Sequence, residues 1–252
     1  MFFAKILNKY NIKYYYCDYC GFLQTEEPHW LKEAYSNPIS IIDTGVMARN
    51  IGMSKITAVV LYFLFNKYGK FLDFAGGYGF LTRLMRDIGF DFYWNDPHST
   101  NLLARGFEAT SKNYKYKLVT AFEVFEHFAE PIKEIESILQ FSDNILFSTE
   151  LLPSTLPKPG EWWYYALEGG QHISLYSYKT LKYIARKYNM NLCSNGRNFY
   201  LFIKNKKINN KIFNFFLKLQ RFGLFFYVRK KIKSLTVGDM NFLISKMKNR
   251  CE

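Results

Sequence analysis

The sequence predicts an α/β protein with a doubly wound, mainly parallel sheet. Strand-like apolar runs alternate with segments of helical spacing from residue 70 to residue 190, which is the pattern of successive βαβ units. The length of 252 residues suits one such domain with appendages. A glycine-rich turn at residues 76–79 follows the first strand-like run. Open α/β sheets bind ligands at that end of their strands.

Each element of this core has a local signal. Residues 70–73 form a short apolar run that ends in an acid. The next helix shows apolar residues at helical spacing and ends at a glycine, in the order Leu81, Leu84, Met85, Ile88 and Gly89. Further on, the sequence predicts strands at 90–94, 117–122 and 144–148, helices from Pro131 and after Ser177, and a closing strand pair at 191–194 and 198–203. Before residue 70 we expect an irregular chain with one helix near 54–67.

The formal net charge of +13 is concentrated in one part of the chain. Residues 169–238 contain 15 Lys and Arg and no Asp or Glu, whereas the remainder has 19 basic and 21 acidic residues. Such a block attracts phosphorylated substrates, anionic lipid or nucleic acid, or forms a solvated surface. We find neither a signal-peptide pattern nor an apolar stretch of roughly 18 residues. The expected location is therefore cytoplasmic, with reduced cysteines.

The glycine turn and a later acid together predict a nucleotide site. Glycines permit a tight turn and close approach of a ligand, and the helix that follows presents free N–H groups. Asp96 lies 17 residues after Gly79, at the end of the second strand, where a carboxylate can accept hydrogen bonds from both ribose hydroxyls. This pattern fits NAD and S-adenosylmethionine (SAM) alike. The acid Asp73 and the segment 121–127 favour SAM.

Three segments resemble motifs of class I SAM-dependent methyltransferases. Residues 72–79 (LDFAGGYG) resemble motif I, although Ala75 stands where glycine is usual. Residues 119–127 (VTAFEVFEH) resemble the segment after the fourth strand, and residues 170–177 (GQHISLYS) resemble the His-containing loop before the late helix. The resemblance runs from about residue 14 to residue 240 and implies an enzyme that transfers a methyl group from SAM.

The closest likeness is to the subgroup found among bacterial surface-polysaccharide and sugar methyltransferases. Its recurring flanking segments resemble residues 17–21 (CDYCG), 43–45 (DTG) and 233–236 (KSLT). The resemblance implies a Rossmann-like, seven-stranded sheet whose seventh strand is antiparallel. We divide the chain into an N-terminal cap facing the substrate (1–69), the SAM-binding core (70–203) and a basic, aromatic, helical C-terminal extension (204–252).

The cofactor residues follow from the turn, the acid and the resemblance. In the implied site Asp96 holds the ribose, the glycine turn faces the methionine part, and residues 106–108 give the adenine edge. The full predicted set is Asp73, Ala75, Gly76, Gly77, Tyr78, Gly79, Asp96, Pro97, Phe107, Glu108, Ala121, Phe122 and Glu123.

Histidine provides the candidate base for an oxygen acceptor, because its ordinary pKa suits proton transfer near neutral pH. Of the four histidines, His127 and His172 fall in loops expected at the rim of the site. We predict His172 as the general base, with His127 or Glu126 as alternatives. The structural alternative is that these histidines only hydrogen-bond the backbone and shape their loops.

Aromatic and polar residues near His172 are candidates for binding the acceptor. Aromatic faces stack on sugar rings and bases, and a hydrophobic lid or core patch is the alternative. Arg49 can meet a carboxylate or phosphate, or form a surface salt bridge. The predicted acceptor set is Arg49, Trp162, Trp163, Tyr164, Tyr165 and Gln171.

No metal is expected. Cys17 and Cys20 have the spacing of half a zinc site, but zinc needs four ligands. Cys193 and Cys251 are distant, and His29 is one nearby candidate. The sequence has no Asp-rich set of the kind found in magnesium-dependent catechol-type enzymes, so we expect metal-independent transfer.

The leading hypothesis is O-methylation of a sugar or sugar-linked group in capsule or O-antigen synthesis, on a nucleotide- or phosphate-linked small molecule or glycan. N-methylation and methylation of another capsule substituent are variants. Nucleic acid is not expected as a partner, because the Pro-Pro-aromatic motif of DNA amino-methyltransferases and a Pro-Cys pair are missing. A non-catalytic protein with this fold and an NAD oxidoreductase complete the alternatives. The extension, with a break at Gly223, packs on the core or forms a homodimer contact, with peripheral membrane binding second.

Overall fold

The computed structural model describes residues 1–36, 43–109, 114–204 and 207–249. The chain forms two compact units that interleave along the sequence. Unit 1 comprises Met1–Asp43, Ala121–Leu139 and Asp143–Asn210, and unit 2 comprises Thr44–Thr120, Gln140–Ser142 and Lys211–Glu252. These units cut across the boundaries at 69/70 and 203/204, so the predicted three-part division stays a prediction.

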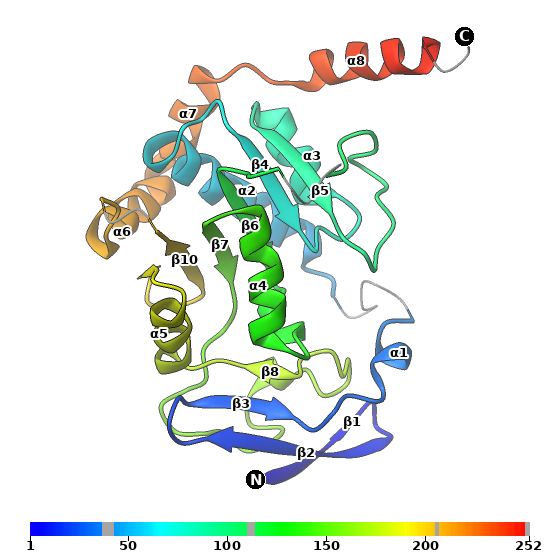
Figure 1. Ribbon diagram of the computed structural model, residues 1–252, viewed down its shortest axis with the longest axis vertical. Coiled ribbons are helices and arrows are strands. Elements are labelled where there is room, and N and C mark those ends of the chain that lie inside the picture. The colour runs from blue at the N-terminus through cyan, green and yellow to red at the C-terminus, as the bar shows by residue number, and fades with distance from the viewer. Residues whose placement is uncertain (37–42, 110–113, 205–206, 250–252) are drawn as a thin grey trace. The chain divides into compact units, whose positions relative to one another are not determined.

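A six-stranded sheet forms the α/β core, as predicted for this fold class (Figure 1). Strand β4 pairs in parallel with β5 and β6, while β10 pairs antiparallel with β7 and β9. The antiparallel closing strand is therefore confirmed. In sheet order the strands are β5 (Asp91–Asn95), β4 (Lys70–Phe74), β6 (Leu118–Phe122), β7 (Asn144–Ser148), β10 (Phe199–Ile203) and β9 (Asn191–Ser194).

The expected seventh strand is reduced to a single bridge in the described part of the chain. Glu108 pairs in parallel with Trp94 of β5, and no longer ladder forms there. The cause is local, because the Gly106 N–H donates to Glu108 Oε2 at 2.9 Å and Gly106 has a left-handed φ of 89°. The segment therefore turns back on itself where an extended strand was expected.

Unit 2 surrounds β4 and β5 with helices. Its helices are α2 (Val46–Leu64), α3 (Phe80–Ile88), α6 (Asn210–Leu219), α7 (Phe225–Lys231) and α8 (Thr236–Lys248). Helix α3 buries Leu81, Met85 and Ile88 and ends at Gly89, as the sequence predicts. Gly89 has a φ of 122°, and a Cβ there would lie 2.3 Å from Ile232 Cγ2.

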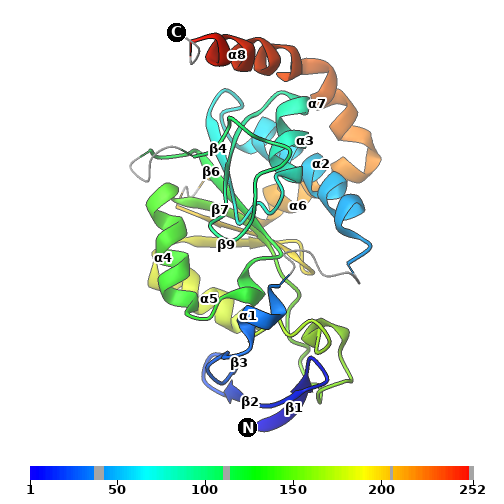
Figure 2. The ribbon, with the colours of Figure 1, turned by 90° about the vertical axis from the view of Figure 1, so that its right-hand side faces the viewer.

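The basic C-terminal segment packs on its own unit through aromatic side chains. Figure 2 shows α6 and α7 beside α2, and the Phe63 and Phe216 rings stack with centroids 4.7 Å apart. Phe213 and Val228 are fully buried. The helical run is interrupted by a π-helical turn, η3 (Gln220–Leu224), in which Gly223 has the predicted break with a φ of 91°. These helices therefore pack on unit 2 with part of their apolar surface, while Phe222 and Phe226 remain exposed, and the predicted dimer or membrane contact stays a prediction.

Helix α8 is attached through a buried ion pair. Arg86 of α3 donates to both oxygens of Asp239, at 2.7 and 2.8 Å, and Arg83 adds a bond of 2.8 Å. Burial alone would raise the pKa of Asp239, but the hydrogen bonds from Arg86 and Arg83 outweigh it and lower that pKa. The bidentate geometry fixes both the position and the rotation of α8.

Unit 1 contains a second sheet that the sequence analysis did not predict. Its strands, in sheet order, are β1 (Phe2–Ile6), β2 (Tyr10–Cys17), β3 (Phe22–Thr25) and β8 (Ser174–Leu175) (Figure 1). The expectation of an irregular N-terminal region is therefore wrong. The β1–β2 hairpin turns at Leu7 and Asn8, with φ of 51° and 54°. Such turns usually pair asparagine or aspartate with glycine, and here Asn8 is the single turn-favouring residue, so the local signal is weak.

The remaining elements of the chain follow the predicted signals. Helix α4 (Pro131–Phe141) begins at Pro131, and α5 (Tyr178–Lys187) is capped by Ser177 in a capping box with Thr180. The short helical elements are α1 (Leu31–Ala34) and the 3₁₀ turns η1 (Phe125–His127) and η2 (Trp163–Tyr165). Among the residues described, no helix combines the length and apolarity that a membrane crossing requires.

Candidate functional site

The predicted cofactor loop follows β4 in unit 2 and is clamped to the end of β5. The Gly77 N–H donates to Asp96 Oδ2 at 2.9 Å, and the Trp94 indole N–H donates to the Gly77 carbonyl at 2.9 Å. The Gly76 N–H reaches the Asn95 carbonyl at 3.3 Å. The loop is thereby held rigid before any ligand arrives. The sequence analysis did not name Trp94 as a site residue, although its position directly before Asn95 and Asp96, at the end of the strand, could have indicated a role at the loop.

Backbone conformation explains the glycines of this loop. A Cβ at Gly76 would lie 2.7 Å from Asp73 Oδ2, and one at Gly79 would lie 2.9 Å from Asn101 Oδ1. Gly77, with a φ of 53°, would meet nothing within 4 Å. Gly76 and Gly79 are therefore required by close packing, whereas Gly77 is required by its φ and leaves the space on its Cβ side open to a ligand.

Asp73 lies beneath the loop and is almost completely buried, with 3% of its surface exposed. Thr120 donates to its Oδ1 at 2.9 Å and Thr82 to its Oδ2 at 3.1 Å. Burial raises the pKa of Asp73 to about 7, against the two threonine hydrogen bonds, which lower it. Asp73 therefore supports the loop from inside. Thr82 and Thr120 are supporting residues that the sequence analysis did not name.

Each carboxylate oxygen of Asp96 accepts a hydrogen bond from a nearby backbone N–H group. Besides Gly77, the His98 N–H donates to Asp96 Oδ1 at 2.8 Å. A carboxylate has about four acceptor positions, so two remain for hydroxyl donors. Pro97, which follows Asp96, is exposed. Asp96 thus joins the loop to the end of β5 while keeping capacity to bind a sugar.

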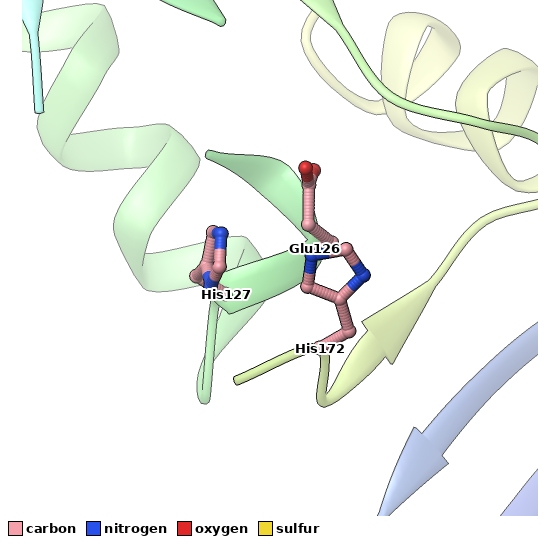
Figure 3. Close-up of side chains that lie close together, drawn as sticks. All are labelled: Glu126, His127 and His172. Carbon is pink, nitrogen blue, oxygen red and sulfur yellow. The ribbon is translucent and has the colours of Figure 1, made fainter. Parts of the chain in front are cut away.

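Unit 1 brings together the three predicted catalytic residues. Figure 3 shows Glu126 and His127 on turn η1 and His172 on the segment before β8. One donor atom from each lies within 4.8 Å of the others, and the two imidazole centroids are 5.1 Å apart. The Ile173 N–H donates to the Glu126 carbonyl at 2.9 Å and ties the two segments together. We call this group the Glu-His-His cluster.

Both histidines of the cluster contact a backbone carbonyl with the same ring atom. His172 Nδ1 lies 2.7 Å from the Tyr164 carbonyl, and His127 Nδ1 lies 3.1 Å from the Gln171 carbonyl and 2.9 Å from the Tyr35 hydroxyl. A carbonyl oxygen only accepts, so we assign the proton of each neutral ring to Nδ1. The Nε2 atoms then carry the lone pairs.

The electrostatics of the cluster favour neutral side chains. Burial lowers the pKa of His127 to about 3, with a further contribution from His172, and lowers the pKa of His172 to about 4. Burial and then the charge of Glu123 raise the pKa of Glu126. Glu126 is fully buried, and no donor meets hydrogen-bond geometry to its oxygens, although the nearby Tyr164 and Thr149 hydroxyls act to lower its pKa. The cluster therefore offers two free imidazole nitrogens and an uncompensated carboxyl group.

Comparison with known proteins places the chain in a family. Residues 48–195, more than half of the chain, match the model of a family described as "Methyltransferase domain". The chain belongs to this methyltransferase family. A search of curated proteins gave no match.

Solved structures similar to this methyltransferase are distant. An O-methyltransferase family 2 protein from Planctomyces limnophilus DSM 3776, solved with apigenin, is 16% identical, with a TM-score of 0.45; the match covers 69% of this chain and 65% of that chain. Human N-acetylserotonin methyltransferase, solved with SAM, is 13% identical, with a TM-score of 0.46 and coverages of 70% and 66%. The chain thus spans slightly less than two thirds of either protein's length.

A third similar structure is the magnesium protoporphyrin IX methyltransferase of Synechocystis PCC 6803, solved with S-adenosylhomocysteine. It is 14% identical, with a TM-score of 0.44, and the match covers 68% of this chain and 90% of that chain. None of these likenesses assigns a substrate to the methyltransferase described here.

The predicted adenine edge of the methyltransferase is connected to the glycine loop through Trp94, which bridges Glu108 and donates to the Gly77 carbonyl. Phe107 is buried beneath the Arg86 guanidinium, which lies 3.7 Å from its ring centroid. Glu108 accepts from Asn101 at 2.8 Å and from the Gly106 N–H. Both line a cavity of about 310 Å³, together with Arg86, Tyr93, Gly106, Asp239, Phe242 and Lys246. No residue of the glycine loop is among them.

Three predicted cofactor residues of the methyltransferase follow directly after Thr120, in unit 1. Ala121 is fully buried, and Phe122 packs on Phe199 with ring centroids 5.8 Å apart. Glu123 has a left-handed φ of 53°, and its N–H donates to the Ser148 hydroxyl at 2.9 Å. A non-glycine residue in this conformation stores strain, which is common at functional sites.

The aromatic segment of the methyltransferase is mainly core. Tyr164 and Tyr165 are each 1% exposed, and the Tyr165 hydroxyl donates to the Pro157 carbonyl at 2.7 Å. Tyr164 packs against His172, with ring centroids 4.6 Å apart. Trp162 is half-buried on the Tyr165 ring, whereas Trp163 is 74% exposed. For the two tyrosines, the core-patch alternative is therefore the one that the structure supports.

The other predicted acceptor and metal residues are spread over the methyltransferase. Gln171 donates to the Ala34 carbonyl at 2.8 Å and borders the Glu-His-His cluster through its own carbonyl. Arg49 is exposed on α2. Cys17 and Cys20 flank the turn after β2, and in the described residues they belong to no group of three or more potential ligands. Cys251 lies outside the described residues.

Proposed function

We propose that this chain is a SAM-dependent methyltransferase that binds its cofactor at the loop of residues 75–79. The family membership of residues 48–195 carries the proposal. It is supported by the open space on the Cβ side of Gly77 and by the acid Asp96 at the end of the neighbouring strand. Free N–H groups at the start of α3 and two unused acceptor positions on Asp96 suit an adenosyl ligand.

Calorimetric titration of SAM into the pure protein tests this proposal. We expect binding to the unchanged chain and at least tenfold weaker binding to Asp96→Ala, because the variant loses both ribose contacts and a loop clamp. The matched control is Asp143→Ala, which removes an exposed carboxylate paired with Lys204. Equal affinity in all three proteins would exclude Asp96 from the site, and no binding at all would exclude a SAM enzyme.

For the acceptor, we propose a hydroxyl on a sugar or sugar-linked group of a surface polysaccharide precursor. The flanking segments at 17–21, 43–45 and 233–236 support this subgroup. The acid-free basic region of residues 169–238 supports a phosphorylated or nucleotide-linked substrate. Incubation with labelled SAM and pools of nucleotide sugars, followed by mass spectrometry, would identify the methylated product. Label appearing only in nucleic acid would contradict the proposal.

We propose that the acceptor is activated at the Glu-His-His cluster, with His172 as the first candidate base. The acceptor oxygen forms a bond to the methyl carbon while the carbon–sulfur bond breaks and its electron pair stays on sulfur. The hydroxyl proton goes to His172, so the products are a methyl ether, S-adenosylhomocysteine and a proton. The site chiefly has to orient the acceptor, since the sulfonium already activates the methyl group.

The transfer rate at saturating SAM tests the role of His172. We expect the transfer rate of His172→Ala to fall by about 100-fold, the lower end of what a general base contributes, and that of His29→Ala to stay the same. His29 is exposed and lies outside the cluster. A loss below tenfold in His172→Ala would exclude His172 as the base.

A further inference from the structure

We propose that the Glu-His-His cluster binds a divalent transition-metal cation, with Zn²⁺ as the preferred ion. Two imidazoles and one carboxylate bring their donor atoms within 4.8 Å of one another (Figure 3). They form the one group of three or more potential ligands within residues 1–36, 43–109, 114–204 and 207–249. Two histidines with one glutamate are an established ligand set for zinc.

The orientation of the histidines is the first support. Metal-binding histidines typically donate their second ring N–H to a backbone carbonyl or carboxylate, which fixes the ring and directs the free nitrogen to the metal. Here the Nδ1 atoms of His127 and His172 lie 3.1 and 2.7 Å from the Gln171 and Tyr164 carbonyls. Both Nε2 atoms are therefore available as ligands.

The carboxylate is the second, independent support. Glu126 is fully buried, yet its oxygens have no partner at hydrogen-bond geometry, and only the nearby Tyr164 and Thr149 hydroxyls interact with them. A buried polar group without a partner destabilises the folded state, and more so when it is charged, so native proteins rarely retain one without a use. A bound cation would supply the missing partner.

The backbone around the cluster is fixed, so only the side chains need to move. The Tyr176 hydroxyl donates to the Phe125 carbonyl at 2.9 Å, and the Ser174 hydroxyl donates to the Phe128 carbonyl at 2.6 Å. With metal–ligand distances of about 2.1 Å, the donor atoms must come to roughly 3–3.5 Å from one another. The donor atoms, which lie within 4.8 Å of one another, would therefore have to approach by about 1 Å.

The ligand set argues for a transition metal over magnesium. Imidazole suits zinc and its neighbours, whereas magnesium prefers carboxylate, carbonyl and water oxygens. Three protein ligands also leave a coordination position open, as in catalytic zinc sites. The proposal departs from the expectation of metal-independent transfer, which rested on the lack of an Asp-rich set.

The part of the cation in catalysis rests on the proposed function, although its binding does not. A cation with an open position binds a hydroxyl and lowers its pKa. His127 and His172 would then be ligands, in place of the base role proposed above for His172, and the proton of the bound hydroxyl would pass to solvent water. Loss of activity in His172→Ala fits either role, so the decisive measurement is of metal binding.

Full-length protein stripped with a chelator and titrated with Co²⁺ or Zn²⁺ tests the site. We expect one equivalent bound by calorimetry and a visible Co²⁺ spectrum without the intense near-ultraviolet bands of thiolate ligation. Glu126→Gln, His127→Asn and His172→Asn should each weaken binding at least tenfold, and His29→Asn should not. The double variant Cys17→Ser/Cys20→Ser should bind as the unchanged chain does.

Two results would overturn the proposal: no stoichiometric binding, or binding that survives all three cluster variants and disappears with the cysteines. SAM titration of the same proteins shows whether the variants remain folded, because the predicted cofactor loop lies in the other unit. SAM binding without metal binding would refute the cation site and leave the proposed function intact. Metal binding without SAM binding would support the cation site and refute the proposed function.

Discussion

Ala75 adopts a left-handed backbone conformation, with a φ of 53°, directly after β4. An L-residue with a Cβ pays roughly 1–2 kcal/mol there, and the family resemblance gives glycine as the usual residue at this position. The loop keeps its conformation, because Asp96 and Trp94 both hydrogen-bond to Gly77 within it. Ala75 is thus a strained residue inside a rigid loop.

Replacing Ala75 by glycine should stabilise the protein. We expect Ala75→Gly to raise the free energy of unfolding by about 0.5–1 kcal/mol, since relief of strain exceeds the extra freedom of glycine in the unfolded chain. Urea denaturation measures the change. The same substitution at Ala185, inside α5, should cost about 1 kcal/mol. A loss of stability at both positions would contradict the assignment of strain.

Asp73 should make stability depend on pH. Burial raises its pKa from 3.8 to about 7 in the folded chain, so the folded protein keeps a proton that the unfolded chain releases near pH 4. The stabilisation from protonated Asp73 is complete below pH 4 and is lost as the pH rises through 7, by on the order of 1 kcal/mol per unit.

Asp73→Asn removes this titration and isolates its effect. The free energy of unfolding of the unchanged chain, minus that of Asp73→Asn, should be larger at pH 5 than at pH 8. The exposed Asp143→Asn serves as the control, with a difference that stays the same at both pH values. A pH-independent difference for Asp73→Asn would show that this carboxyl group titrates normally in the folded protein.

At the residue scale, the sequence predicted the proposed site residues better than the residues that hold them in place. The glycine turn, Asp96 and the pair Glu126-His127 follow from local patterns. The contacts of Thr82 and Thr120 with Asp73, and of Tyr164 with His172, join residues far apart in the chain. No periodicity or local spacing reports such contacts, which depend on how the elements pack.

Helix α8 is held mainly through its buried Asp239, with smaller contacts from Thr236 to Asp87 and from Phe242 to Phe107. Several apolar side chains of α8 are exposed, including Val237, Met240 and Met247, whereas Asp239 is 5% exposed. Its partner Arg86 also donates to the Phe92 carbonyl at 2.8 Å. The anchor is therefore both buried and fully hydrogen-bonded.

Asp239→Ala should release α8 and leave Arg86 without its main counter-charge. Breaking a buried ion pair on one side costs about 3–5 kcal/mol, and we expect a loss near 3 kcal/mol in chemical denaturation. Asp143→Ala breaks an exposed pair and should cost below about 1 kcal/mol. Similar losses in the two variants would mean that the Arg86–Asp239 pair contributes no more than a surface pair.

At the element scale, periodic and capped segments were predictable. The boundaries of α3, β7 and the start of α5 follow glycine, strand and capping signals. Two failures have physical causes. Leu7 and Asn8 form a tight hairpin turn without glycine, and the Glu108 side chain accepts from its own loop, where the pairing with β5 is limited to a single bridge. Local hydrogen bonding decided these cases.

On the scale of the whole molecule, the two proposed chemical parts fall in different compact units. The loop of residues 75–79 and Asp96 belong to unit 2, and the Glu-His-His cluster belongs to unit 1. The α/β class could be predicted because its core is continuous in sequence. The interleaving of the two units along the sequence could not be predicted, because pairings such as that of β3 with β8 join segments that share no local pattern.

The pairing of β3 with β8 has a consequence for synthesis of the protein. Gln24 and Leu23 pair with Ser174 and Leu175, so about 150 residues must be made between the two partners. At 5–20 residues per second, the three newly made strands β1–β3 remain without their fourth strand, β8, for roughly 10–30 s. During that time their edge and their apolar face, with Ile12 and Leu23, are exposed outside the ribosome. Chaperones that bind nascent chains would have their natural target in this interval.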